Sequence, residues 1–201
     1  MSGITATRKV PKISKDTLLE IHKRQNGICI YCGRPVDIKE QKGTAWNIEH
    51  IVPRAVFKWL ERMVSKEESN EIFSLIEDKN NIAIVHKKCN VSRGSSLPAI
   101  NFAKKIYASD ELKKTYTEHI NKTEKYIRMY SDLLYSTLNS QRCKCGRCSK
   151  YMSAESAILR RRNTSKIRNN RNIIALCFEC NQKTKRSKYG TVNTDIEFNG
   201  K

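Results

Sequence analysis

The stretches GICIYCGRPVD at residues 27–37 and NNIAIVHKKCNVSRGSS at residues 80–96 decide the fold of this 201-residue chain. The first contains Cys29 and Cys32 with two residues between them, and the second contains His86 and Cys89 at the same spacing. Thiolate and imidazole groups paired in this way are the usual ligands of tetrahedral zinc. The sequence therefore predicts a closed, structural Zn²⁺ site with four ligands: Cys29, Cys32, His86 and Cys89.

Two later stretches repeat this pattern, CKCGRCSKYMS at residues 143–153 and RNIIALCFECNQKTKRS at residues 171–187. We expect a second structural Zn²⁺ site formed by Cys145, Cys148, Cys177 and Cys180. Cys143 is left over and could compete with Cys145 as a ligand. The N-terminus lacks the apolar segment of a signal peptide, which favours reduced, metal-binding cysteines and a cytoplasmic location.

The two pairs of stretches indicate an internal repeat. Asn81 aligns with Asn172, His86 with Cys177, and Asn90 with Asn181, in that order. Between the cysteine pairs, WNIEHIVPRA at residues 46–55 aligns with MSAESAILRR at residues 152–161. This alignment sets Glu155 against Glu49 and Ser156 against His50. We therefore expect a degenerate second copy that lacks the histidine.

The predicted fold class is α+β. We expect one zinc module at residues 1–98, a helical linker at 99–140 and a basic zinc module at 141–201. Hydrophobic periodicity predicts one long amphipathic helix over residues 110–138. Other expected elements are a helix at 14–26 closed by Gly27, a strand at 46–52, one or two helices within 56–77, a strand at 81–85, and a further helix beginning at Pro98. Trp46 and Trp59 are expected in the core, and His22 and His119 on the surface.

Charge favours a polyanionic partner. The chain has 39 Lys+Arg against 20 Asp+Glu, a net charge of +19, and residues 141–201 supply +11 of it. Because Arg forms paired hydrogen bonds with phosphate, a dense Arg run predicts a nucleic-acid contact, the alternative being a solvated loop. No apolar run is long enough to span a membrane, so a membrane partner is not expected. The predicted contacts are Arg160, Arg161, Arg162, Lys166, Arg168 and Arg171.

Residues 14–96 resemble the HNH endonuclease family, whose fold is called ββα-metal. The resemblance rests on a CxxC pair, then Glu49 to Pro53 (EHIVP), Asn81-Ile82, and a second pair followed by Asn90 and Arg93-Gly94. In a zinc-bearing subset of this family, such cysteine pairs hold the fold together. The resemblance implies a phosphodiester hydrolase with one catalytic divalent cation, Mg²⁺ or Mn²⁺.

The chemistry assigns His50 as the general base, because a neutral imidazole can take a proton from water near pH 7. The resemblance implies that Glu49 and Asn90 coordinate the cation, and that Asn81 braces the loop carrying the histidine. Adjacent strand residues point to opposite faces, so Glu49 and His50 cannot both face the phosphate from a regular strand. We therefore expect the strand to end or bulge at these two residues. Lys88 and Arg93 are further predicted phosphate contacts.

We therefore expect a metal-dependent endonuclease acting on double-stranded DNA, of the site-specific, restriction type. With one active centre in each chain, cutting both strands needs a homodimer or two successive nicks. The alternatives are a non-enzymatic, zinc-dependent DNA-binding protein, a non-specific or RNA-directed HNH nuclease, and a structural zinc protein of a ribonucleoprotein.

Overall fold

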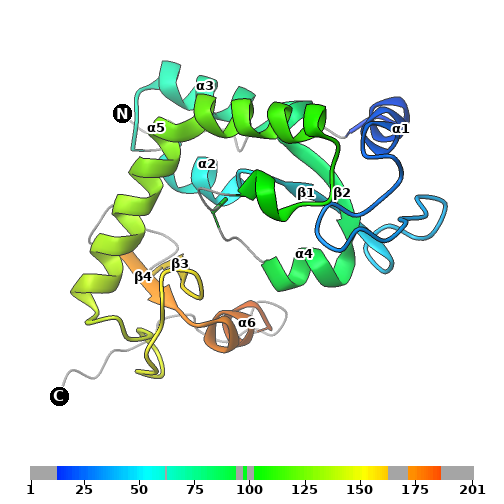
Figure 1. Ribbon diagram of the computed structural model, residues 1–201. Helices are drawn as coiled ribbons and strands as arrows, with labels where there is room; N and C mark the ends of the chain where they lie inside the picture. Colours follow the sequence, from blue (N-terminus) through cyan, green and yellow to red (C-terminus); the bar gives the residue numbers. More distant parts are fainter. Residues whose placement is uncertain (1–12, 62, 94–96, 99–101, 163–171, 187–201) are drawn as a thin grey trace. The chain divides into compact units, whose positions relative to one another are not determined.

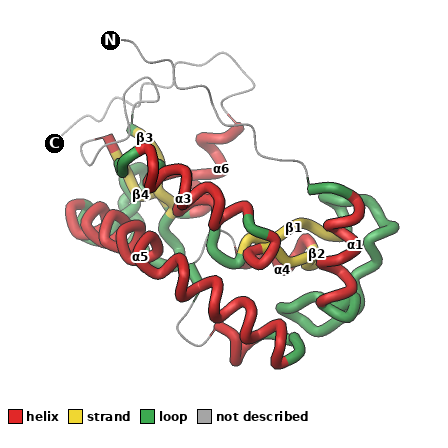
Figure 2. Tube along the Cα trace, turned by 90° about the horizontal axis from the view of Figure 1, so that it is seen from above, coloured by secondary structure: helices red, strands yellow, loops and turns green. Residues whose placement is uncertain are grey.

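The computed structural model describes residues 13–61, 63–93, 97–98, 102–162 and 172–186 (Figure 1). Within these residues the chain is mixed α+β, as predicted, with six α-helices and two separate two-stranded antiparallel sheets. Figure 2 shows strand confined to these two short pairs. The elements are α1 (Lys15–Arg24), β1 (Trp46–His50), α2 (Arg54–Leu60), α3 (Lys66–Glu77), η1 (Lys79–Asn81), β2 (Ile82–His86), α4 (Lys87–Arg93), η2 (Phe102–Lys105), α5 (Asp110–Ser140), β3 (Ile158–Arg161), β4 (Ile173–Leu176) and α6 (Phe178–Arg186).

The chain groups into two compact units. The first unit takes the described residues within 1–52, 73–94 and 98–122, and the second unit takes those within 53–72, 95–97 and 123–201. Helices α3 and α5 each contribute residues to both units. Each unit contains one sheet and one cysteine cluster.

The sheet of the first unit pairs β1 with β2, with Glu49 opposite Ala83 and His50 opposite Ile82. Helix α1 contacts β2, and helix α4 contacts both strands. The strand ends at His50 and not at Val52, and both Glu49 and His50 are paired in regular register with β2, so no bulge separates them. Beyond it, the amide of Ile51 donates to the carbonyl of Asn81 at 2.8 Å.

Helix α1 shows how the sequence sets its own ends. The Ser14 hydroxyl caps the first turn by accepting from the amide of Thr17 at 3.1 Å. The helix ends at Arg24, two residues before the predicted boundary, because Asn26 already adopts a positive φ of 53°. Gly27 follows with φ 67° and donates its amide to the carbonyl of His22. The chain is thereby turned directly into the first cysteine pair.

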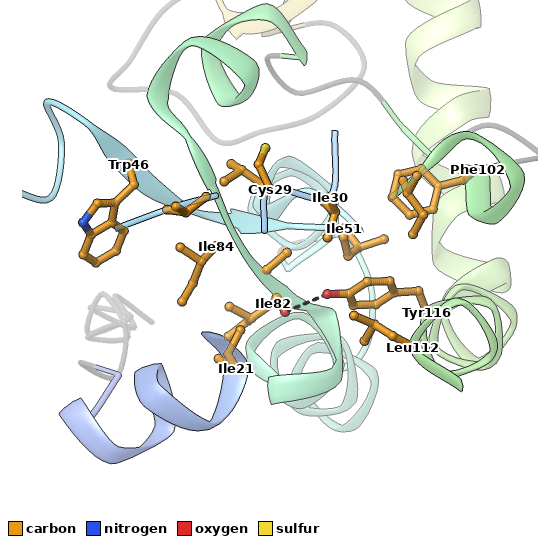
Figure 3. Packing of buried hydrophobic residues seen from close by; sticks show 14 residues of the cluster. Ile21, Cys29, Ile30, Trp46, Ile51, Ile82, Ile84, Phe102, Leu112 and Tyr116 are labelled. Carbon is orange, nitrogen blue, oxygen red and sulfur yellow. Dashed lines mark hydrogen bonds between the residues drawn. The ribbon is translucent and has the colours of Figure 1, made fainter. Parts of the chain in front are cut away.

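The core of the first unit packs around β1 and β2 (Figure 3). Trp46, 3% exposed, lies at one end of the cluster, and Phe102 and Tyr116 lie at the other. The Tyr116 hydroxyl donates to the carbonyl of Ile82 at 3.4 Å, so the phenol is buried without losing its polar partner. The predicted core position of Trp46 is confirmed.

The second unit has its own sheet, in which β3 pairs with β4 and every residue of β4 is buried. Helix α5, shared by the two units, was predicted over residues 110–138 and runs two residues further, to Ser140. Of the predicted stripe, Leu112, Tyr116, Tyr130 and Leu134 are buried. Trp59 is buried, also as predicted.

Three expectations for helices need correction. His119 is 3% exposed and not a surface residue, because α5 is packed on a wider face than its apolar stripe covers. The side chain of His22 is half-buried and bonds the carbonyl of Val36 at 2.7 Å. Pro98 itself is not helical, and residues 99–101 lie outside the described residues. Among the described residues, no helix is long and apolar enough to cross a membrane.

Candidate functional site

The first cysteine cluster brings together the four predicted ligands Cys29, Cys32, His86 and Cys89, whose ligand atoms all lie within 4.8 Å of one another. Nδ1 of His86 lies 3.3 Å from the sulfur of Cys32, while Nε2 lies 3.0 Å from the carbonyl of Pro35. An Nε2–H that donates to this carbonyl leaves Nδ1 as the ligand atom and fixes the ring. The cluster could hold a zinc ion.

The second cysteine cluster brings together Cys145, Cys148, Cys177 and Cys180 under the same distance limit. The amide of Cys177 donates to the sulfur of Cys145 at 3.4 Å, which favours the thiolate. Four sulfur donors at this spacing suit zinc. This cluster too could hold a zinc ion.

In each cluster the pKa of one thiol is lowered and the pKa of another is raised. Burial acts to raise the pKa of Cys32, but hydrogen bonds with Arg34 and His86 lower it to about 6. Burial and the neighbouring sulfurs raise the pKa of Cys89 to about 12. In the second cluster, burial opposes but backbone amides lower the pKa of Cys145 to about 6, and burial raises that of Cys180 to about 12. Metal binding favours the thiolate form of a cysteine ligand, so a divalent cation would oppose the raised pKa values.

Cys143 is not a member of the second cluster. It has a positive φ of 55°, is exposed, and donates its amide to the carbonyl of Leu138. Gly27 makes the same bond to His22 in the first unit, also with positive φ. Cys143 thus takes the place of a turn glycine, and the predicted competition with Cys145 does not occur in this structure.

Glu49 is the centre of a buried polar network at the end of β1. Its side chain accepts hydrogen bonds from the Tyr31 hydroxyl at 3.1 Å and from the Asn90 amide at 2.9 Å, and it pairs with Arg93. Burial raises the pKa of Glu49, and Arg93 and Tyr31 pull it in the opposite direction. The structure therefore brings Glu49 and Asn90 together, from β1 and α4.

His50 lies next to this network but has a different neighbour. Its Nε2 is 3.8 Å from the Glu77 carboxylate, and its side chain is 11% exposed. Glu49 and His50 contact different residues, as expected for adjacent positions of a strand. A carboxylate beside the imidazole stabilises the positive charge that the ring acquires on taking a proton.

Asn81 joins the end of β1 to the start of β2. Its side chain accepts from the Val52 amide at 2.7 Å and donates to the carbonyls of Val52 at 3.0 Å and Ile76 at 2.8 Å. Asn81 has no exposed surface, so these bonds are made away from water. They brace the segment that follows His50, which is the contact predicted for this residue.

Arg93 and Lys88 lie on α4. Besides Glu49, Arg93 donates to the carbonyls of His50 at 3.0 Å and Ile51 at 2.6 Å, so its guanidinium ties the end of β1 to α4. Lys88 is exposed. Their predicted phosphate contacts stay predictions, and the structure adds a bracing role for Arg93.

The second unit repeats the hydrogen bonds of the first, and these bonds define which residues correspond. Gln25 exchanges two hydrogen bonds with the backbone of Ile84, at 3.0 and 2.7 Å. Gln141 does the same with the backbone of Ala175, at 3.0 and 2.7 Å. Ile84 therefore corresponds to Ala175, which agrees with the predicted pairing of His86 with Cys177.

The strand register then shows which residues of the second unit correspond to Glu49 and His50. Ile84 pairs with Ile48, and Ala175 pairs with Leu159, so the residues that follow Ile48 and Leu159 correspond in turn. Each strand ends two residues further on, β1 at His50 and β3 at Arg161. The pair that corresponds to Glu49 and His50 is therefore Arg160 and Arg161.

Two further contacts support this correspondence. The amide of Arg162 donates to the carbonyl of Asn172 at 3.0 Å, as the amide of Ile51 does to Asn81. Nε of Arg160 donates to Oδ1 of Asn181 at 2.5 Å, at the position of the contact between Glu49 and Asn90.

The sequence alignment of Glu155 with Glu49 and of Ser156 with His50 is wrong. Both residues precede β3, and the Ser156 hydroxyl closes a local turn by donating to the carbonyl of Ser153 at 3.1 Å. At the positions of Glu49 and His50, the second unit has the guanidinium groups of two arginines, and not the carboxylate and hydroxyl that the alignment placed there. Of the predicted Arg run, Lys166, Arg168 and Arg171 lie outside the described residues.

Sequence reasoning missed Tyr31, Glu77 and the glutamines Gln25 and Gln141. Each glutamine lies four residues before the first cysteine of its cluster, so a longer repeat alignment would have found the pair. No local signal marks Glu77 as a neighbour of His50, because α3 is brought to β1 only by the fold.

Comparison of the chain with models of protein families, with curated proteins and with solved structures finds no match.

Proposed function

We propose that this chain is a zinc-stabilised HNH endonuclease that hydrolyses phosphodiester bonds of double-stranded DNA. The observation that carries the proposal is the hydrogen bond, 2.9 Å long, from the Asn90 side chain of α4 to the Glu49 carboxylate. Glu49 lies on β1, directly before the last residue of the strand, His50. The antiparallel pair β1 and β2, with α4 packed on both strands, supports a ββα-metal arrangement for the first unit.

The two side chains suit a catalytic cation. Glu49 offers carboxylate oxygen, and Asn90, whose amide nitrogen donates to Glu49, has its carbonyl oxygen left as a ligand. Oxygen donors of this kind select Mg²⁺ or Mn²⁺ over zinc, which takes the thiolate clusters. Bound there, the cation would supply Lewis-acid stabilisation of the scissile phosphate and the leaving oxygen.

The residues around the cation site have separate tasks. His50 takes a proton from the attacking water, and Glu77 stabilises the imidazolium that results. Asn81 holds the segment after His50 through Val52, so the imidazole is presented from a braced strand end. Arg93 holds the carbonyls of His50 and Ile51 and so joins this strand end to α4.

The two cysteine clusters take structural Zn²⁺ in this proposal. Each is closed, with four side-chain ligands and no position left for substrate. The net charge of +19 supports a nucleic-acid substrate. A restriction-type, site-specific enzyme with one hydrolytic centre in each chain nicks one strand at a time, and a homodimer would cut both.

The test is cleavage of supercoiled plasmid and of a long linear duplex with Mg²⁺, Mn²⁺ or EDTA. We expect cleavage with either cation, none with EDTA, and loss of roughly 10²- to 10⁴-fold in the His50→Ala variant. Ser156→Ala is the matched control, because Ser156 lies outside the proposed centre. Discrete fragments from the linear duplex would indicate site specificity, and a smear a non-specific nuclease.

Plasmid that stays intact under all conditions, yet is bound tightly, would overturn the enzyme and favour the alternative of a zinc-dependent DNA-binding protein. Cleavage of RNA in preference to duplex DNA would overturn the proposed substrate.

A further inference from the structure

The end of β3 in the second unit has the same backbone arrangement as the proposed catalytic centre, but its side chains are positively charged where the first unit has a carboxylate. Asn172 and Asn181 stand where the first unit has Asn81 and Asn90, and both are buried. Arg160 and Arg161 stand at the positions of Glu49 and His50. Neither guanidinium can act as a ligand of a cation or as a general base near pH 7. The scaffold is therefore retained without its proposed chemistry.

Arg160 is held in a defined position. Its Nε donates to the Asn181 side chain at 2.5 Å, and Asn181 is only 4% exposed. This bond uses one of five guanidinium N–H groups and leaves the terminal fork, which matches a phosphate or a carboxylate in two parallel bonds. Asn90 presents its amide nitrogen to a carboxylate, whereas Asn181 presents its oxygen to a cation.

The charge of Arg160 is not balanced within the part of the chain that the structure describes. No carboxylate there lies within ion-pair distance of Arg160, although the side chain is partly buried. Burial lowers the pKa of Arg160, and no acidic group opposes the shift. A partly buried cation without a counter-charge destabilises the fold, and a bound anion offsets that cost.

We propose that the end of β3, formed by Arg160, Arg161 and Asn181, binds a backbone phosphate of duplex DNA without a metal ion and without cleaving it. In the first unit a carboxylate would collect a cation, which neutralises the phosphate. In the second unit a guanidinium at the same position neutralises the phosphate directly. The choice of DNA as the source of the phosphate rests on the proposed function of the first unit.

The test measures binding of the full chain to a fluorescent DNA duplex in a His50→Ala background, over a series of salt concentrations. Arg160→Gln removes the charge and keeps an amide that can donate to Asn181. We expect roughly tenfold weaker binding and a salt slope that is smaller by about one, the value for one lost phosphate contact. Arg160→Lys keeps the charge but not the fork, so its affinity should fall between the two.

Lys150→Gln is the matched control, because it removes one positive charge from an exposed side chain of the same unit, 3.9 Å from Glu179. We expect it to change affinity by less than Arg160→Gln. Equal losses of affinity from both variants would show that only the net charge of the chain matters, and would overturn the phosphate site. Two zinc ions retained per chain in each variant would show that the fold is intact.

The outcomes separate the two proposals. A chain that cleaves DNA but binds equally well after Arg160→Gln would overturn the phosphate site alone. A chain that binds DNA through Arg160 and never cleaves it would sink the proposed function and support the phosphate site. Tighter, Arg160-dependent binding of duplex RNA than of duplex DNA would overturn the assignment to DNA.

Discussion

In the first unit the strand beside the cysteine cluster ends in Glu49 and His50, whereas the corresponding strand of the second unit ends in Arg160 and Arg161. The backbone around these ends is held by the same bonds in both units. A glutamine side chain bonds the backbone of β2 or β4, and the amide after the strand end donates to the carbonyl of Asn81 or Asn172. The scaffold therefore does not decide what a unit can do with a phosphate. In both proposals, the two side chains at the end of one strand set the difference.

The largest expected effect separates the two units by the zinc ions that we propose for their cysteine clusters. Cys29→Ser and Cys145→Ser each remove one ligand from one cluster. Since structural zinc contributes about 10–16 kcal/mol in small domains, each variant should unfold its own unit first. Zinc content per chain, together with limited proteolysis, measures this. Loss of both ions from either variant would show that the clusters are coupled and not independent.

The next prediction compares one chemical change at two corresponding positions. Glu49→Gln should lower the rate of cleavage about a hundredfold or more, because it weakens the site of a Lewis acid worth several kcal/mol. Arg160→Gln should leave the rate of cleavage by the bound complex unchanged while weakening binding. Single-turnover rates at saturating enzyme separate the two quantities. A slower single turnover for Arg160→Gln would place Arg160 in the chemistry of the first unit.

The sequence predicted both cysteine clusters because their ligands come in closely spaced pairs. It predicted helix α5 because hydrophobic periodicity is a signal within one element. It misassigned the strand end of the second unit because the connecting loops differ in length. Seventeen positions separate Cys32 from Glu49, and twelve separate Cys148 from Arg160. Matching like residues led to Glu155, whereas the register depends on backbone hydrogen bonds that no residue type records. His119 was misplaced for a related reason, since burial on α5 depends on the whole packed face.

A third prediction compares the two glutamines. Gln25 is 3% exposed, and Gln141 is partly exposed. Gln25→Ala leaves the amide and carbonyl of Ile84 without partners in the core, and should lower the free energy of unfolding by about 2–4 kcal/mol. Gln141→Ala should cost less, because water can reach part of its site. Denaturant unfolding of the zinc-loaded proteins checks the order, and an equal cost at both positions would contradict it.

The smallest expected effect concerns two corresponding core positions, at which the two units place their large and small residues in opposite order. The first unit has Ile30 and Ala83 in its buried cluster, and the corresponding pair in the second unit is Gly146 and Ile174. A Cβ added at Gly146 would lie 2.2 Å from Cδ1 of Ile174, so one position must stay small for the other to be large.

Gly146→Ala should therefore lower the free energy of unfolding by about 1–3 kcal/mol through overpacking. Ile174→Ala alone should also destabilise, because it leaves a cavity. The double variant should cost less than the sum of the two, since the new methyl group occupies part of the space that Ile174 vacates. A double-mutant cycle by denaturant unfolding measures this coupling. Strict additivity would mean that the two side chains do not share one space, and that the two cores are filled in unrelated ways.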